Sequence, residues 1–140
     1  MEPLAPAYLA DLASLLSSVG AFLGGFAATY LATLLTLGNQ GRVMTASIAC
    51  AAASAVAFIV SVIASISVIA HVHPQAPRSM DAFSGDGLRA AMVLAFVVGI
   101  LSLFASVGLS GWTRSKGVGR ITTVIAALGM LVTVMVVFRP

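Results

Sequence analysis

Residues 43–72 read VMTASIACAAASAVAFIVSVIASISVIAHV, and this stretch decides the class of the fold. It contains no Asp, Glu, Lys or Arg, and it exceeds the roughly 20 apolar residues that a helix needs to cross a bilayer. A helix that is apolar on every side is either the core of a large protein or a membrane span. Because the chain has only 140 residues, we predict a membrane-spanning helix here.

Three further apolar stretches accompany this one, and short polar segments that contain glycine, proline and charged residues separate them. The predicted spans are residues 8–37, 43–72, 88–112 and 118–138. Helices joined by short connections run antiparallel to their neighbours in the chain. The sequence therefore predicts an all-α, polytopic membrane protein: an antiparallel four-helix transmembrane bundle that forms a single domain over residues 1–140.

The composition agrees with this class and excludes others. Hydrophobic residues make up 60% of the chain and charged residues 8%, whereas about a quarter of the residues of a soluble domain are charged. The 7 Lys and Arg residues are too few to form the basic face of a nucleic-acid-binding protein. We therefore expect no nucleic-acid partner. The expected surroundings are the lipid bilayer, and the expected partners are copies of the chain or another membrane protein.

The cations near the ends of the predicted spans bear on orientation. The first and third connections carry Arg42, Arg114, Lys116 and Arg120, and the opposite side carries Arg78, Arg89 and Arg139. Loops rich in Lys and Arg stay in the cytoplasm, and acidic residues contribute little to this rule. We expect the third connection to be cytoplasmic and both termini to lie outside. The absence of a eukaryotic targeting sequence favours a bacterial inner membrane as the host cell membrane.

Small residues at four-residue spacing are the most specific pattern in the first two spans. The first span has two such ridges, Gly20, Gly24, Ala28 and Ala32 beside Ser17, Ala21, Gly25 and Thr29; the second has Ala49, Ala53, Ala57, Ser61 and Ser65. Small residues let helix backbones approach closely in lipid. Either these ridges join the two helices within one chain, or one ridge does so and another binds a second subunit. The candidate packing and assembly residues are Gly20, Gly24, Gly25, Ala28, Ala53, Ala57 and Ser61.

Hydroxyl groups are the main polar groups inside the predicted spans. A Ser or Thr in a spanning helix commonly bonds to a carbonyl of its own helix. The alternative is that several hydroxyls face a shared axis of an oligomer and line a water-filled path, with Thr29, Thr33, Ser61 and Ser65 as the candidates. No charged residue lies in the middle of a span, which argues against a transporter coupled to protons or ions.

Candidates for a metal site occur only at the end of the second span and in the longest connection: His71, His73, Asp81 and Asp86. Two imidazoles and one or two carboxylates suit a divalent ion. His-x-His pairs are common, however, and the two aspartates also fit ordinary turn and helix-entry chemistry. We therefore predict no metal and no cofactor.

No nucleophile with a neighbouring base, no phosphate-binding glycine loop and no paired carboxylates are recognisable, so we do not expect an enzyme. The first hypothesis is a small non-enzymatic integral membrane protein that acts through assembly, as a homo-oligomer or as an accessory subunit of a membrane complex. The alternative is a homo-oligomeric channel or pore-forming membrane effector. The two differ in whether the four candidate hydroxyls face water or are packed dry.

Overall fold

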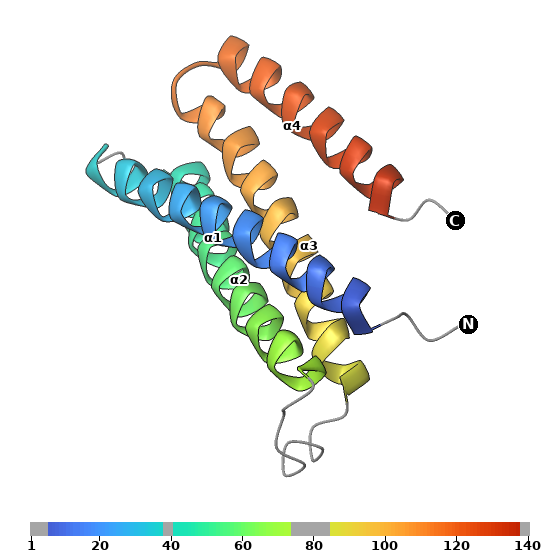
Figure 1. Ribbon diagram of the computed structural model, residues 1–140. Helices are drawn as coiled ribbons and strands as arrows, with labels where there is room; N and C mark the ends of the chain where they lie inside the picture. Colours follow the sequence, from blue (N-terminus) through green and yellow to red (C-terminus); the bar gives the residue numbers. More distant parts are fainter. Residues whose placement is uncertain (1–5, 38–40, 74–84, 138–140) are drawn as a thin grey trace.

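The computed structural model describes residues 6–37, 41–73 and 85–137, which are helical almost throughout (Figure 1). The elements are α1 (Pro6–Thr36), α2 (Arg42–Val72), α3 (Gly85–Ser110), the short 3-10 helix η2 (Gly111–Thr113) and α4 (Lys116–Val137). Successive long helices run in opposite directions (Figure 1). All four are long and apolar enough to cross a membrane. These findings confirm the predicted all-helical class and are consistent with a multi-pass membrane protein.

Local chemistry explains where the helices begin and end. Pro6 opens α1, a position where proline is favoured because its missing N–H has no partner in the helix. At the start of α4, the Ser115 hydroxyl accepts a hydrogen bond from the backbone N–H of Val118 at 3.2 Å and so caps the helix. The cap places the start of α4 at Lys116, two residues before the predicted start of the fourth span.

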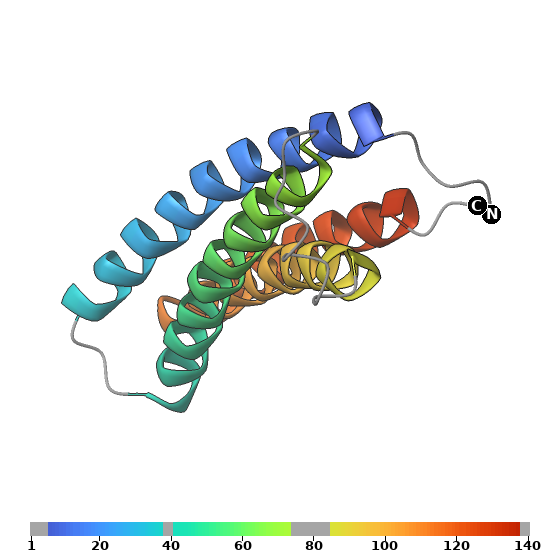
Figure 2. The ribbon, with the colours of Figure 1, turned by 60° about the horizontal axis from the view of Figure 1, so that its bottom comes forward.

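The helices pack in chain order as an open array. In the described residues, α2 lies between α1 and α3, while α4 packs mainly on α3 and η2 (Figures 1 and 2). Of the four helices, α2 is the most buried and α4 the least. The predicted bundle is therefore not closed around a common core. Lipid gives no hydrophobic drive for α4 to fold back onto α1, because lipid tails are as apolar as the helix surface.

The core between α1 and α2 contains many small residues, with leucines near both ends of α1. The buried positions of α1 recur every three or four residues or after a full heptad: Leu9, Ala13, Gly20, Gly24, Ala27 and Leu34. This spacing resembles the seam of a coiled coil. One large ring, that of Phe58, is fully buried where α1, α2 and α3 meet.

Candidate functional site

Three buried serines form the contact between α2 and α3. Each donates a hydrogen bond from its hydroxyl to a backbone carbonyl of α3: Ser47 to Ser106 at 2.9 Å, Ser54 to Gly99 at 2.8 Å, and Ser61 to Met92 at 3.1 Å. The serines are seven residues apart, and their acceptors are seven apart in the reverse order, as antiparallel helices require. The Ser106 hydroxyl returns a bond to the Ser47 carbonyl at 2.7 Å. We call this contact the serine seam; it satisfies polar groups in an apolar interior.

The four candidate pore-lining hydroxyls do not lie together in the chain. Ser61 and Ser65 are fully buried, and the Ser65 hydroxyl donates to the Ser61 carbonyl at 2.8 Å. Thr29 and Thr33 lie on the exposed side of α1 and donate to the carbonyls of Gly25 and Thr29 at 2.9 and 3.0 Å. Two candidates are thus packed dry, two face outward, and three of the four bond to their own helix.

Cysteine labelling tests whether any of these hydroxyls faces water. In a Cys50→Ala background, we expect Ser61→Cys and Ser65→Cys to be unreactive toward a membrane-impermeant maleimide, because both positions are fully buried. Thr29→Cys should also be unreactive, because this exposed position lies within a span that we expect to be surrounded by lipid. Ser115→Cys, in the exposed turn before α4, is the positive control when the reagent is added to both sides of the membrane. Labelling of position 61 or 65 in intact membranes would support a water-filled path instead.

The two small-residue ridges of α1 have different surroundings. A Cβ atom added at Gly20 would lie 3.2 Å from Val62 Cγ2, and one added at Gly24 would lie 3.3 Å from Phe58 Cβ. Gly25 is exposed, and a Cβ added there would meet nothing within 4 Å. Ala28 is exposed as well. Gly20 and Gly24 therefore pack on α2, whereas Gly25 and Ala28 contribute to an outer surface.

The ridge predicted on α2 is only partly in the interior. Ala53 is exposed, Ala57 is half-buried, and Ser61 is buried. Ser54 lies beside the predicted ridge in the sequence pattern, with Ala46 and Cys50, but neither Ser47 nor Ser54 is among the predicted packing residues. Their seven-residue spacing, continued by Ser61, is the signal that could have identified them.

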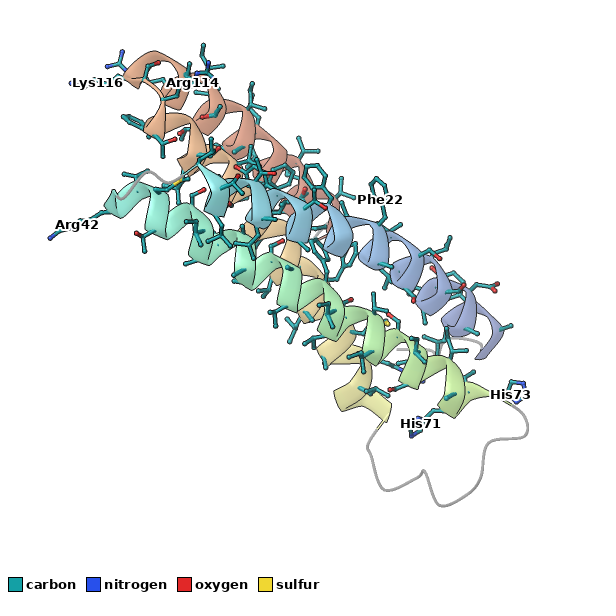
Figure 3. All side chains as sticks on the ribbon, turned by 90° about the vertical axis from the view of Figure 1, so that its left-hand side faces the viewer. Phe22, Arg42, His71, His73, Arg114 and Lys116 are labelled. Atoms are coloured by element: carbon teal, nitrogen blue, oxygen red, sulfur yellow. The ribbon has the colours of Figure 1, made fainter. Side chains whose placement is uncertain are left out.

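A shallow groove of about 330 Å³ runs along the outer side of the α1–α2 pair. Ala21, Gly25 and Ala28 line it from α1, and Ile59 and Ile63 are among the residues that line it from α2. Its walls are almost entirely carbon. We call Ala21, Gly25 and Ala28 the outer ridge. Next to it, Phe22 projects outward from α1 with 75% of its side chain exposed (Figure 3).

The candidate metal ligands lie at or beyond the end of α2. His71 Nδ1 is 3.0 Å from the carbonyl oxygen of Ser67, and His73 follows the last residue of the helix (Figure 3). Asp81 lies outside the described residues, and Asp86 belongs to the first turn of α3. Within residues 6–37, 41–73 and 85–137, no three His, Cys, Asp or Glu side chains are grouped as metal ligands.

The opposite end of the molecule is cationic. Arg42 of α2, Arg114 in the turn before α4 and Lys116 of α4 are exposed there (Figure 3). Arg120, in the second turn of α4, is exposed as well. The serine seam places α2 and α3 in a register that brings Arg42 level with η2. In the described part of the chain, the acidic residues lie toward the other end: Asp11 in the second turn of α1 and Asp86 in the first turn of α3.

Comparison with known proteins gives no match: no family model, no curated protein and no solved structure is similar to the chain. Function must therefore be inferred from the surfaces of the molecule itself. Three of these surfaces bear on it: the outer ridge with its groove, the cationic end, and the exposed faces of α3 and α4.

Proposed function

We propose that this protein is a non-enzymatic integral membrane protein that acts by assembling with other membrane helices, as a homo-oligomer or as an accessory subunit of a membrane complex. One observation carries this proposal: the outer ridge of α1 is exposed although it has the same small residues that pack α1 on α2. In lipid, contacts through small residues are a main source of helix association. None of the described helices of its own chain covers this ridge, so the ridge suits a helix of a second molecule.

Self-association is the form of assembly that we favour. A twofold interface uses the same patch on both subunits, so the patch must fit itself. Here a protruding ring, Phe22 of α1 with 75% exposure, lies beside the groove between α1 and α2, where a Cβ added at Gly25 would meet nothing within 4 Å. Phe22 of each copy would enter the groove of the other copy.

For the orientation, we propose that the cationic end is cytoplasmic and that both termini lie outside. The four exposed cations at that end support this, because Lys and Arg near span ends are retained on the cytoplasmic side. As the host membrane, we propose a bacterial inner membrane. The variant Ser115→Cys in a Cys50→Ala background tests the proposal. A membrane-impermeant thiol reagent added to whole cells should label this single cysteine only after the cells are lysed.

Two neighbouring glycines provide a matched test of assembly. We expect Gly25→Leu to leave the fold of the single chain unchanged, because a Cβ atom added at Gly25 has no neighbour within 4 Å. The same substitution should abolish oligomers. Gly24→Leu should instead lower the free energy of unfolding by about 1–3 kcal/mol, because the new side chain would overlap Phe58. Native mass spectrometry of protein gently solubilised from its host membrane measures the oligomer, and thermal unfolding in detergent measures stability.

The outcomes of this experiment separate the alternatives. If Gly25→Leu assembles as well as the wild type, the outer ridge is not the interface and the proposal is wrong. A wild-type assembly of four or more copies that also conducts ions in liposomes would favour the channel. Recovery of a single copy bound to a different membrane protein would identify an accessory subunit.

A further inference from the structure

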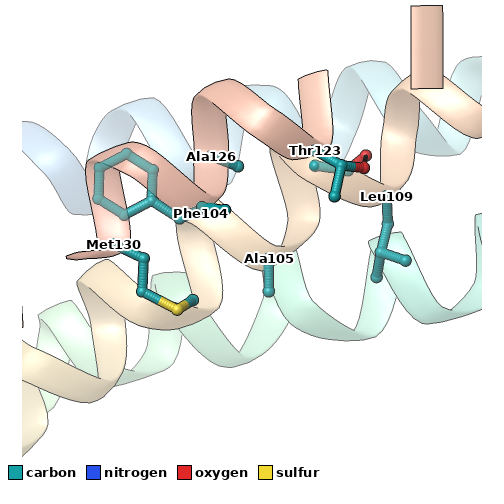
Figure 4. A pocket seen from close by; sticks show the side chains of 8 residues that line it. Phe104, Ala105, Leu109, Thr123, Ala126 and Met130 are labelled. Carbon is teal, nitrogen blue, oxygen red and sulfur yellow. Dashed lines mark hydrogen bonds between the residues drawn. The ribbon is translucent and has the colours of Figure 1, made fainter. Parts of the chain in front are cut away.

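An apolar crevice of about 340 Å³ lies between α3 and α4. Phe104, Ala105 and Leu109 line it from α3, and Ala127 and Met130 are among the residues that line it from α4 (Figure 4). Its walls are almost entirely carbon. From Thr123 at one end to Met130 at the other it spans seven residues of α4, or about 10 Å of helix rise. The crevice is therefore elongated and runs along the helices.

The crevice is bounded at one end by a tight joint between the two helices. Trp112 Nε1 donates a hydrogen bond to the Thr123 hydroxyl at 2.8 Å. Gly119 lies directly against the indole, since a Cβ added there would be 2.7 Å from the ring. A tryptophan that is 45% exposed at the end of two spans typically lies at the boundary between headgroups and acyl chains. The crevice then lies at acyl-chain depth, directly below that boundary.

Cations continue the same face of α4 beyond the joint. Lys116, Arg120, Thr123, Ala127 and Met130 follow one another at alternating spacings of four and three residues. Residues at these spacings share one side of a helix. Arg120 is therefore one turn above Thr123, and Lys116 is one turn above Arg120. Arg114, in the preceding turn, is exposed at the same end.

We propose that this crevice and the cations above it bind one anionic phospholipid. An acyl chain lies along Ala127 and Met130, and the phosphate of the headgroup is held by Lys116 and Arg120, with Arg114 nearby. Arginine is well suited to this role because its guanidinium can donate two parallel hydrogen bonds to a phosphate. The occupant must be amphipathic. Hydrocarbon alone would fill the crevice without contacting the cations, and a free phosphate would bind the cations without filling the crevice. The site lies on α3 and α4, so it is independent of self-association through α1.

Lipid titration followed by native mass spectrometry tests this site. The delipidated full chain is titrated separately with phosphatidylglycerol, with phosphatidylcholine of identical acyl chains, and with glycerol phosphate as the free headgroup. We expect one phosphatidylglycerol per chain, with about a tenfold preference over phosphatidylcholine, because each cation near an anionic headgroup strengthens binding severalfold. Glycerol phosphate should not bind at the same concentrations.

Two kinds of variant separate the headgroup contacts from the acyl-chain contacts. The double variant Lys116→Gln and Arg120→Gln should lose the preference and bind both lipids equally. Ala127→Phe should weaken the binding of both lipids about tenfold, because the phenylalanine ring fills the crevice while the cations remain. Leu128→Phe is the control, since the adjacent Leu128 is 57% exposed on the lipid side. Each variant is first compared with the wild type by thermal unfolding.

Several results would overturn the proposal. These are equal binding of the two lipids by the wild type, an unchanged preference in the double glutamine variant, and unchanged lipid binding by Ala127→Phe. Glycerol phosphate that binds as tightly as phosphatidylglycerol would also overturn it, because the cations would then hold a phosphate without the crevice.

Discussion

Phe58→Ala is expected to lower the free energy of unfolding by about 3–5 kcal/mol, the cost of truncating a fully buried aromatic ring. Phe58 is 0% exposed and lies where three helices meet. Gly24 of α1 and Gly99 of α3 both approach it, and the ring of Phe96 packs edge-on with its centroid 5.8 Å away. Truncation removes the ring that Gly99 and Phe96 of α3 contact, whereas the Phe58 Cβ that Gly24 of α1 approaches remains. Thermal or detergent-induced unfolding of the purified monomer measures the effect.

A double-mutant cycle attributes the loss to this packing. Gly99→Ala alone should be destabilising, because its Cβ would lie 2.9 Å from Phe58 Cε1. In the Phe58→Ala background the same methyl group enters vacated space, so its cost should disappear. We expect a coupling of about 1–2 kcal/mol, within the range measured for residues in contact. Gly25→Ala, which meets nothing within 4 Å, should show no coupling. Additive effects at positions 58 and 99 would mean that the two residues do not pack as described.

The helical class and the four spans are predictable from the sequence because they depend on length and local apolarity. The arrangement of the helices is not. In a soluble protein, polar and apolar faces show which side of a helix points inward, but in lipid both sides are apolar. The exposed Ile121 of α4 and the buried Phe58 of α2 do not differ in polarity. The open array and the position of α4 therefore depend on side-chain shape, which a hydropathy pattern does not contain.

Two patterns on α2, the predicted ridge at four-residue spacing and the serines at seven-residue spacing, show where a spacing argument is reliable. A step of four residues turns an ideal helix about 40° past a full turn, so a ridge of such steps winds around the helix. This is why Ala53 is exposed and Ser61, two steps later, is buried. A step of seven residues departs from two full turns by only about 20°. A seven-residue repeat therefore stays on one face, and Ser47, Ser54 and Ser61 remain against α3 throughout.

The candidate pore hydroxyls could not have been assigned from the sequence. Ser61 and Thr29 have similar chemistry and both lie in long apolar stretches. Their surroundings differ because Ser61 lies opposite a carbonyl of α3, whereas Thr29 has only its own helix to bond with. Which hydroxyl finds a partner across the interface depends on the register of two helices. That register is set by the whole length of the contact.

Ser54→Leu is expected to separate α2 from α3 and to lower the free energy of unfolding by about 2–4 kcal/mol. Ser54 is fully buried, and its hydroxyl is 2.8 Å from the carbonyl oxygen of Gly99. Leucine removes this hydrogen bond and adds volume opposite Gly99, where α2 and α3 are in close contact. Ser54→Ala removes only the bond and should cost about 0.6 kcal/mol, the average for hydrogen bonds between membrane helices. The large difference between the two variants would show that close approach, more than hydrogen bonding, holds the serine seam.

The adjacent residue supplies the control. Ala53→Leu adds about as much volume as Ser54→Leu, but Ala53 is exposed, so the monomer should be about as stable as the wild type. Unfolding is measured in a detergent that keeps every variant monomeric, so that assembly does not contribute to the comparison. Ser47→Ala extends the test, because Ser106 can still donate to the Ser47 carbonyl at 2.7 Å and the loss should be small. If Ala53→Leu is as damaging as Ser54→Leu, the face of α2 that contacts α3 has been assigned wrongly. If only Ser54→Leu is damaging, the seven-residue repeat is the feature of this sequence that holds its two central helices together.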